Sequence, residues 1–168
     1  MLQRFLVAID GSESGNVALD FATAVARQAS GSIRVLLVNE QLIGSRNLLL
    51  FTRDEATALI TDAVERLREA GIQGSGSVRP AAHRHVAAMI SAEAQRYGAD
   101  AIVLGSRRRR RLGRFFSSQV RERTTRATSL PVLTAPSPLE IGTIMRRRDS
   151  EVDLSREFDL EEFLRISR

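Results

Sequence analysis

Short apolar runs alternate with amphipathic stretches along the first 135 residues of the chain. The apolar runs predict strands buried on both faces, and apolar residues repeating at a spacing near 3.6 predict helices between them. The expected strands cover residues 5–9, 33–38, 72–79, 101–104 and 132–135, of which the third is a short edge strand. The expected helices run from Ser12 or Ser14 to Gly31, and over residues 54–70, 83–97 and about 117–128.

Two connections in this pattern carry their own expectations. Gly31 stands where a glycine commonly ends a helix, so we expect it to end the first one. The connection over residues 40–52 is unusually apolar and contains Leu48, Leu49, Leu50 and Phe51. We interpret these four residues as the start of the next helix or as a packed flap, rather than as a ligand-binding segment.

Alternating strands and helices predict β-α-β units with right-handed crossovers, and hence an α/β protein with a doubly wound parallel sheet and helices on both faces. In such a sheet the ligand site lies beyond the carboxyl ends of the strands, where the strand order reverses. Asp10, Asn39 and Gly105 follow the first, second and fourth strands. The topology therefore predicts a site shared by the first and fourth strands.

Arginine dominates the loop after the fourth strand. Six of the eight residues from 107 to 114 are arginine, and a new helix follows, with Ser117 or Ser118 as its cap. A loop that leads into a helix N-terminus suits phosphate, because backbone N–H groups and the helix dipole point at the anion. The same run is typical of a solvated loop without a ligand, and polyphosphate, nucleic acid or a protein are further candidates. No aromatic residue interrupts residues 107–111, so we do not expect nucleic acid to stack there.

Composition excludes several classes of site. The absence of cysteine rules out disulfides and thiolate metal sites. His83 and His85 stand two residues apart with no third ligand in view, so we expect a capping or surface role and no metal site. No apolar run reaches roughly eighteen residues and no charged-then-apolar leader is present, so we expect no membrane span and a cytoplasmic location.

The net charge of +5 is unevenly distributed. Residues 149–168 hold seven acidic residues and three arginines, a net of −4, which leaves +9 on the rest of the chain. All 25 basic residues are arginine, and we attribute this to the base composition of the genome. A basic body with an acidic tail attracts an anionic ligand, or its own tail.

Several stretches together resemble the universal stress protein family. The opening of that family is similar to FLVAIDGSE at residues 5–13, and its penultimate strand and phosphate loop are similar to YGADAIVLGSR at residues 97–107. LGR at residues 112–114, the Gln119-Val120 helix start and LPVL at residues 130–133 continue the match in register. The resemblance covers residues 4–136 and implies a five-stranded, Rossmann-like parallel fold that binds adenine nucleotides. It also implies a homodimer, often formed through the last strand.

The phosphate-binding glycines of that family are largely replaced. Nucleotide-binding members carry glycine, two residues, glycine, nine residues, then Gly-Ser; this chain has Gly105, Arg108 and Ser118-Gln119 at the matching positions. Glycine lets backbone N–H groups approach phosphate oxygens closely, sometimes at positive φ, which costs another residue about 1 kcal/mol or more. Arginine grips phosphate bidentately, so charge can replace backbone contact.

The resemblance assigns roles to individual residues. The positions that would surround an adenine nucleotide are Ala8, Ile9, Asp10, Val38, Leu104, Gly105, Arg108, Ser118, Gln119 and Val120. Further phosphate or anion contacts would come from Arg107, Arg109, Arg110 and Arg111. Asp10 either faces the ribose or caps the first helix and holds its loop. If the nucleotide is ATP, Mg²⁺ is expected with it.

The residues favour a binding protein over an enzyme. Ser12 and Asp10 are the only candidate nucleophile and base beside the site, and neither has a histidine or lysine nearby in sequence. Asp10-Gly11-Ser12-Glu13-Ser14-Gly15 is not the dinucleotide-binding turn of dehydrogenases. We therefore expect a regulatory, stress-response protein that binds ATP, AMP or cyclic AMP weakly; the alternative is a nucleotide-independent dimeric adaptor that recruits a partner through its arginine loop or its tail.

The ends of the expected domain carry two more expectations. The domain covers residues 1–136, and its last strand offers an apolar edge for a homodimer, formed by Val132, Leu133, Thr134 and Ala135. Residues 137–168 form an extension, basic and then acidic, with a possible short helix over residues 159–166. So short a helix is unstable alone in water. The extension either docks on the basic body and competes with anions, or awaits a protein partner.

Overall fold

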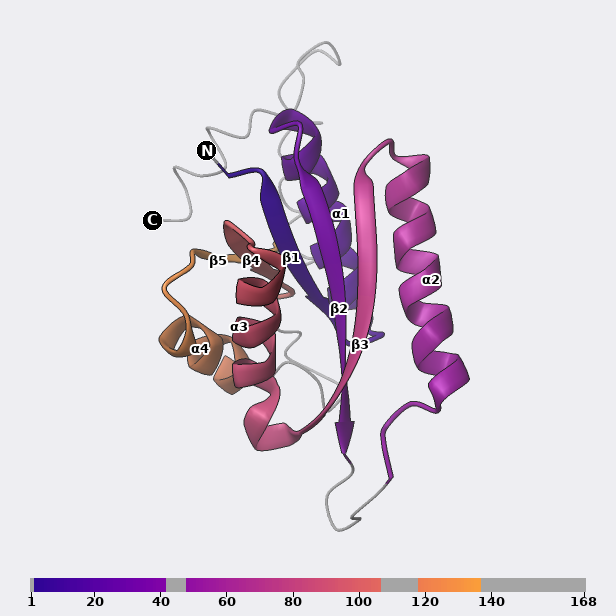
Figure 1. The fold of residues 1–168 in the computed structure, drawn as a ribbon, viewed down its shortest axis with the longest axis vertical. Coiled ribbons are helices and arrows are strands. Elements are labelled where there is room, and N and C mark those ends of the chain that lie inside the picture. The colour runs from indigo at the N-terminus through magenta and orange to yellow at the C-terminus, as the bar shows by residue number, and fades with distance from the viewer. Residues whose placement is uncertain (1, 42–47, 107–117, 137–168) are drawn as a thin grey trace, which may run out of the picture. The chain divides into compact units, whose positions relative to one another are not determined.

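The computed structural model describes residues 2–41, 48–106 and 118–136 (Figure 1). In these ranges strands and helices alternate strictly along the chain. The elements are β1 (Arg4–Ile9), α1 (Glu13–Gln28), β2 (Ser32–Gln41), α2 (Arg53–Glu69), β3 (Gln73–Ala82), a 3-10 turn (His83–His85), α3 (Val86–Tyr97), β4 (Ala101–Leu104), α4 (Ser118–Ala127) and β5 (Val132–Thr134).

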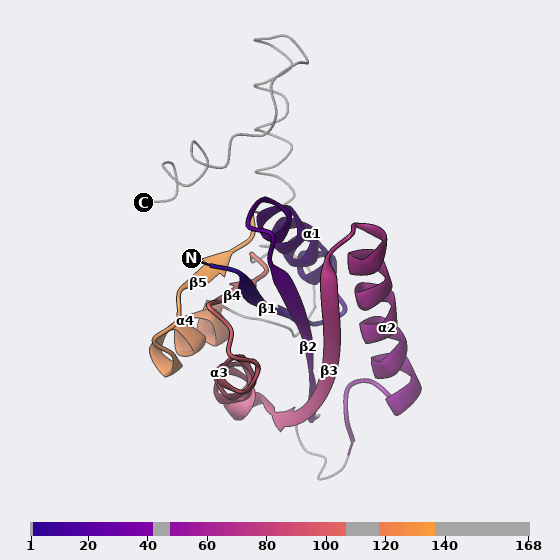
Figure 2. The ribbon, with the colours of Figure 1, turned by 45° about the horizontal axis from the view of Figure 1, so that its top comes forward.

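The five strands form one parallel sheet in the order β3-β2-β1-β4-β5. Helices α1 and α2 pack on one face, and α3 and α4 on the other, as the two views show (Figures 1 and 2). The expected doubly wound, five-stranded α/β fold is therefore confirmed. The strand order reverses at β1, which pairs with β2 on one side and β4 on the other.

Two apolar layers account for the unbroken apolar runs. Phe5, Val7 and Ile9 of β1 face α1 and α2, whereas Leu6 and Ala8 face α3 and α4. Each of these side chains is at most 5% exposed. Since successive residues of a strand point to opposite faces, a strand covered on both sides must be apolar at every position.

The first two helices begin at side-chain caps. The Ser12 hydroxyl accepts a hydrogen bond from the Gly15 N–H at 3.3 Å, which identifies Ser12 as the cap of α1. At α2, Thr52 and Glu55 form a reciprocal capping box. These bonds satisfy N–H groups that the helices themselves leave unpaired.

The expectation that α1 ends at Gly31 is wrong, because the helix ends at Gln28. The residue with positive φ is Ser30, at +49°. Gly31 is required for space instead, because a Cβ there would lie well under 3.0 Å from the carbonyl oxygen of Gln3. The Gly31 N–H donates to the Ala26 carbonyl, which closes the helix end without a left-handed glycine.

Strand β3 is longer than the expected short edge strand. It pairs with β2 over its full length, from Ser32↔Gln73 to Gln41↔Ala82. Gly74 and Gly76 lie against α2, where added Cβ atoms would collide with Leu67 and Ile60. Serines occupy the alternate positions, so glycine here lets α2 approach the sheet and does not break the strand.

The starts of α2 and α3 exclude one of the two alternatives expected at each. Helix α2 begins at Arg53, so of the two alternatives for residues 48–51 the helix start is wrong; Phe51 packs against the core, as expected of a packed flap, while Leu48 is 61% exposed. Helix α3 begins at Val86, after the 3-10 turn, and no side chain caps either start there. Of the two roles expected for the histidines, capping is not found; His85 is exposed and the His83 side chain is 38% exposed, which fits the surface role.

The segment 137–168, with its expected helix at 159–166, lies outside the described residues. None of the helices in the described ranges is long and apolar enough to cross a membrane.

Candidate functional site

Asp10 lies at the carboxyl end of β1 and holds the turn into α1. The Asp10 Oδ1 accepts hydrogen bonds from the Ser12 N–H at 3.0 Å and from the Ser12 hydroxyl at 2.5 Å. Gly11, at φ +72°, makes the turn that returns Ser12 to Asp10. Burial raises the pKa of the Asp10 carboxyl, although the bonds from Ser12 act to lower it. A buried carboxyl whose ionised form is disfavoured by desolvation is a common feature of binding sites.

Gly105 ends β4 directly beside the first turn of α1. A Cβ on Gly105 would lie 2.6 Å from the Ser14 carbonyl oxygen and closer still to its hydroxyl. The Ser14 hydroxyl in turn donates to the carbonyl of Ser106 at 2.5 Å. The loops after β1 and β4 are thus joined, as the topology predicted for a site shared by these two strands.

Val38 and Asn39 at the end of β2 have different roles. Ile9 pairs with Leu37, so Val38 lies level with Asp10 on the neighbouring strand, where it is 5% exposed and part of the core beside α3. The Asn39 amide donates to the Phe51 carbonyl at 2.8 Å, and its oxygen accepts from the Phe51 N–H at 3.0 Å. Asn39 therefore fixes the segment before α2, on the opposite face from Val38.

The remaining predicted nucleotide residues divide by accessibility. Four have buried side chains in the sheet and the helix layers: Ala8, Ile9, Leu104 and Val120. Ser118 begins α4 and Gln119 is exposed beside it. The predicted phosphate contacts lie outside the described residues: Arg107, Arg108, Arg109, Arg110 and Arg111.

A pair that sequence reasoning missed stands further along the same end of the sheet. His83 Nδ1 and Glu40 Oε2 are 2.7 Å apart, and the Glu40 side chain is 12% exposed. Glu40 follows Val38 on the same face of β2, and His83 follows β3 directly. No group of three or more potential metal ligands occurs among the described residues. Only the pairing of β2 with β3 brings these two residues together, and the apolar pattern of a single strand does not reveal that pairing.

These features define an α/β protein with a doubly wound sheet whose strand order reverses between β1 and β4, the position at which such sheets commonly bind ligands. Asp10, 7% exposed, and Val38, 5% exposed, lie at the carboxyl ends of neighbouring strands. The sequence matches the universal stress protein family over residues 1–136. The chain therefore belongs to the universal stress protein family, as the sequence resemblance predicted.

Solved structures of similar proteins agree with this assignment. A universal stress protein family member from Burkholderia pseudomallei is 25% identical, with a TM-score of 0.64 over 81% of this chain and 97% of that one. A universal stress protein from Archaeoglobus fulgidus, solved in complex with dAMP, is 21% identical, with a TM-score of 0.57 over 81% and 98%. A family member from Arabidopsis thaliana, solved with AMP bound, is 18% identical, with a TM-score of 0.58 over 79% and 90%. The comparison with curated proteins gives no match.

Proposed function

We propose that this chain is a cytoplasmic regulatory protein, not an enzyme, that binds an adenine nucleotide weakly at the end of the sheet shared by β1 and β4. The observation that carries the proposal is the joining of Asp10 and Gly105 through the first turn of α1. Family members solved with AMP or dAMP support the choice of an adenine nucleotide. Asp10 would hold the ribose, and the arginines after β4 would hold the phosphates, with Mg²⁺ if the nucleotide is ATP.

A second candidate is a nucleotide-independent dimeric adaptor. The replacement of the family's glycines by Arg108 and Ser118-Gln119 favours it, because these residues restrict the close approach of backbone to phosphate. A thermal shift with ATP, AMP and cyclic AMP distinguishes the two functions. A ligand at a hundred times its dissociation constant stabilises the folded protein by about 2.7 kcal/mol. If none of the three nucleotides raises the melting temperature, the adaptor is favoured.

Restoring the family's glycines should strengthen ATP binding. The variant Arg108→Gly/Ser118→Gly/Gln119→Ser regains the freedom of the backbone, and we expect an affinity gain of about tenfold by calorimetry. The control is Arg108→Ala, which removes the same charge without adding a glycine and should weaken binding. Wild-type binding should also fall steeply with salt. If the triple variant binds no more tightly than the wild type, the substitutions are not what weakens the site.

Replacing Asp10 by asparagine should separate ligand binding from stability. Asparagine retains an oxygen for the Ser12 bonds and avoids burying a charge, so stability at neutral pH should stay equal or rise by up to about 1 kcal/mol. Because the folded pKa is raised, protonation relieves the cost in the wild type, and any difference should shrink as the pH falls below that pKa. Nucleotide affinity should drop about tenfold, since a charge-assisted bond to the ribose is lost. Unchanged affinity with reduced stability would leave Asp10 only the task of holding the loop.

A homodimer through β5 completes the proposal. β5 is an edge strand of the sheet, and Val132 and Leu133 are only partly buried in the described part of the chain. An exposed apolar edge is a common site of strand pairing between copies.

A further inference from the structure

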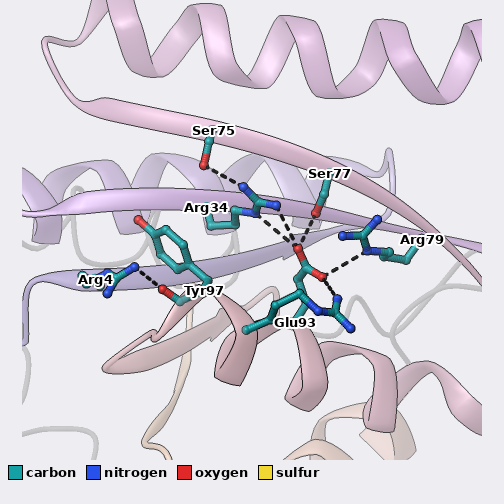
Figure 3. Close-up of polar contacts among 8 residues, drawn as sticks. Arg4, Arg34, Ser75, Ser77, Arg79, Glu93 and Tyr97 are labelled. Carbon is teal, nitrogen blue, oxygen red and sulfur yellow. Dashed lines mark hydrogen bonds and ion pairs between the residues drawn. The ribbon is translucent and has the colours of Figure 1, made fainter.

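Glu93 is a buried carboxylate surrounded by arginines on the α3 face of the sheet (Figure 3). Its side chain is 1% exposed. Oε1 accepts bonds from Arg34 Nη2 and the Ser77 hydroxyl, each at 3.1 Å. Oε2 accepts from Arg79 Nε at 3.1 Å and from Arg96 Nη1 at 2.5 Å. One carboxylate on α3 thus binds side chains from β2, β3 and its own helix.

The charges of this cluster do not balance. Three guanidinium groups meet one carboxylate, which leaves a local excess of two positive charges. Arg34 is the most covered, at 27% exposure, and also donates a bond from Nη1 to Ser75. Arg79 and Arg96 are 37% and 58% exposed, and each uses one nitrogen on Glu93. Both therefore present charged N–H groups to an anion from solvent.

A second guanidinium-rich contact continues this surface toward the start of β1. Arg4 stacks over the Tyr97 ring at 4.6 Å from its centre, and Arg34 lies 5.9 Å from the same centre. The Tyr97 hydroxyl bonds to Ser32 at 2.9 Å. Arginine and tyrosine are among the residues enriched where protein interfaces concentrate their binding energy.

The surface lies on a part of the sheet that α3 covers only partly. Arg34, Ser75, Ser77 and Arg79 occupy the α3 face of β2 and β3, and all four remain partly accessible. In a doubly wound sheet both faces are normally apolar, so a polar face on two strands is unusual. Ser75 pairs with Arg34 near the amino end of β2, whereas the nucleotide site is at the carboxyl ends of β1 and β4. Arg79, in contrast, pairs with Val38, so this surface extends from the amino end of β2 to the strand position beside the proposed nucleotide site.

The edge of β3 lies beside this charged face. β3 is the outermost strand on its side, and in the described part of the chain it pairs only with β2. An edge strand offers free backbone groups to an extended peptide, whose alternate side chains then fall over one face of the sheet. Over the α3 face of β3 those side chains would meet Ser75, Ser77 and Arg79.

We propose that the edge of β3 and the arginines around Glu93 form a docking surface for an extended acidic segment of a partner protein. The backbone of that segment pairs with β3, and its alternate carboxylates bind Arg79 and Arg96. A second copy using this same face would bring two positively charged surfaces together, which disfavours self-pairing. Nucleic acid would satisfy the arginines but has no backbone that pairs with a strand.

The test uses a fluorescein-labelled short peptide in which glutamate alternates with threonine or valine, and its glutamine counterpart. Anisotropy titrations compare the wild type with Arg79→Gln/Arg96→Gln, which leaves Arg34 to balance Glu93. We expect the double variant to lose at least about tenfold in affinity for the glutamate peptide. The matched control, Arg53→Gln/Arg68→Gln, removes two exposed arginines of α2 on the other face and should change affinity by less than about twofold.

If the double variant folds poorly, NMR chemical shifts of the backbone amides in the wild type provide a second measurement. Binding of the glutamate peptide should shift the amides of Ser75, Ser77 and Arg79 and leave those of α2 unchanged. Equal losses in both double variants, shifts elsewhere, or equal binding of the glutamine peptide would overturn the proposal. So would tighter binding of a single-stranded DNA of equal charge, or concentration-dependent dimerisation that Arg79→Gln/Arg96→Gln enhances.

Discussion

Glu93→Gln should destabilise the fold by about 3 kcal/mol, measured by urea unfolding at neutral pH. Glutamine keeps the shape of the side chain but turns an acceptor into a donor facing guanidinium groups. It also leaves Arg34, Arg79 and Arg96 without the charge that holds them together. The loss is large because Glu93 itself is buried and Arg34, at 27% exposure, stays largely desolvated, whereas Arg79 and Arg96 can be solvated on their exposed sides.

The difference in stability between the wild type and Glu93→Gln should depend on pH. Burial would raise the pKa of Glu93, but bonds from Arg79, Arg34 and Ser77 outweigh it and lower the pKa from 4.5 to about 2. A carboxyl with a lowered folded pKa stabilises above its unfolded pKa and loses that contribution as the pH falls. Wild-type stability should therefore fall between pH 4.5 and about 2, and the gap to Glu93→Gln should close there.

The control is Glu122→Gln, which removes the carboxylate of an exposed pair with Arg126. We expect a change of at most about 0.5 kcal/mol, since water solvates both groups. Similar losses in the two variants, or a Glu93→Gln protein whose stability keeps the wild-type pH dependence, would contradict the assigned role of Glu93.

Gly105→Ala should have the second-largest effect. We expect it to lower the free energy of unfolding by about 2 to 3 kcal/mol and also to abolish nucleotide binding. The new methyl group would lie 2.6 Å from the Ser14 carbonyl oxygen, which belongs to the backbone and cannot rotate away. The first turn of α1 must therefore move from β4, and the loops that form the proposed site separate. Thermal unfolding and ATP calorimetry measure the two losses.

Gly71→Ala is the matched control for this prediction. Gly71 has φ +74° and no atom within 4 Å of an added Cβ, so alanine there costs only the conformational strain, about 1 kcal/mol. Adding Ser14→Gly to Gly105→Ala removes the clash with the hydroxyl but not with the carbonyl, and should restore only part of the stability. Full recovery would show that the Ser14 hydroxyl alone requires glycine at position 105.

The sequence predicted the fold well because two signals agreed. Buried strands of an α/β sheet are apolar at every position, and the helices between them show clear apolar spacing, with a cap at Ser12. The topology then brought Asp10 and Gly105 to one edge. What it missed depended on close packing: Gly31 and Gly105 are glycine because another chain segment lies against them, and no local pattern records that contact.

The Glu93 cluster escaped prediction for a related reason. Glu93 shares the buried face of α3 with Val86, Ile90 and Ala94, so its helix remained recognisable by its apolar spacing. An acidic residue on such a face signals a buried partner. The partners come from strands that are far away in sequence, and only the pairing of β2 with β3 brings Arg34 and Arg79 within reach of it.

Glycine and serine alternate along β3, and the two sets of positions differ in the substitutions that they tolerate. Positions 74 and 76 admit no larger side chain, because α2 occupies the space. Positions 75 and 77 face the partly open side, where a new side chain meets solvent and the arginines. A related protein could thus acquire a different surface chemistry on β3 through changes at every second residue, and its hydrophobic interior would remain as it is.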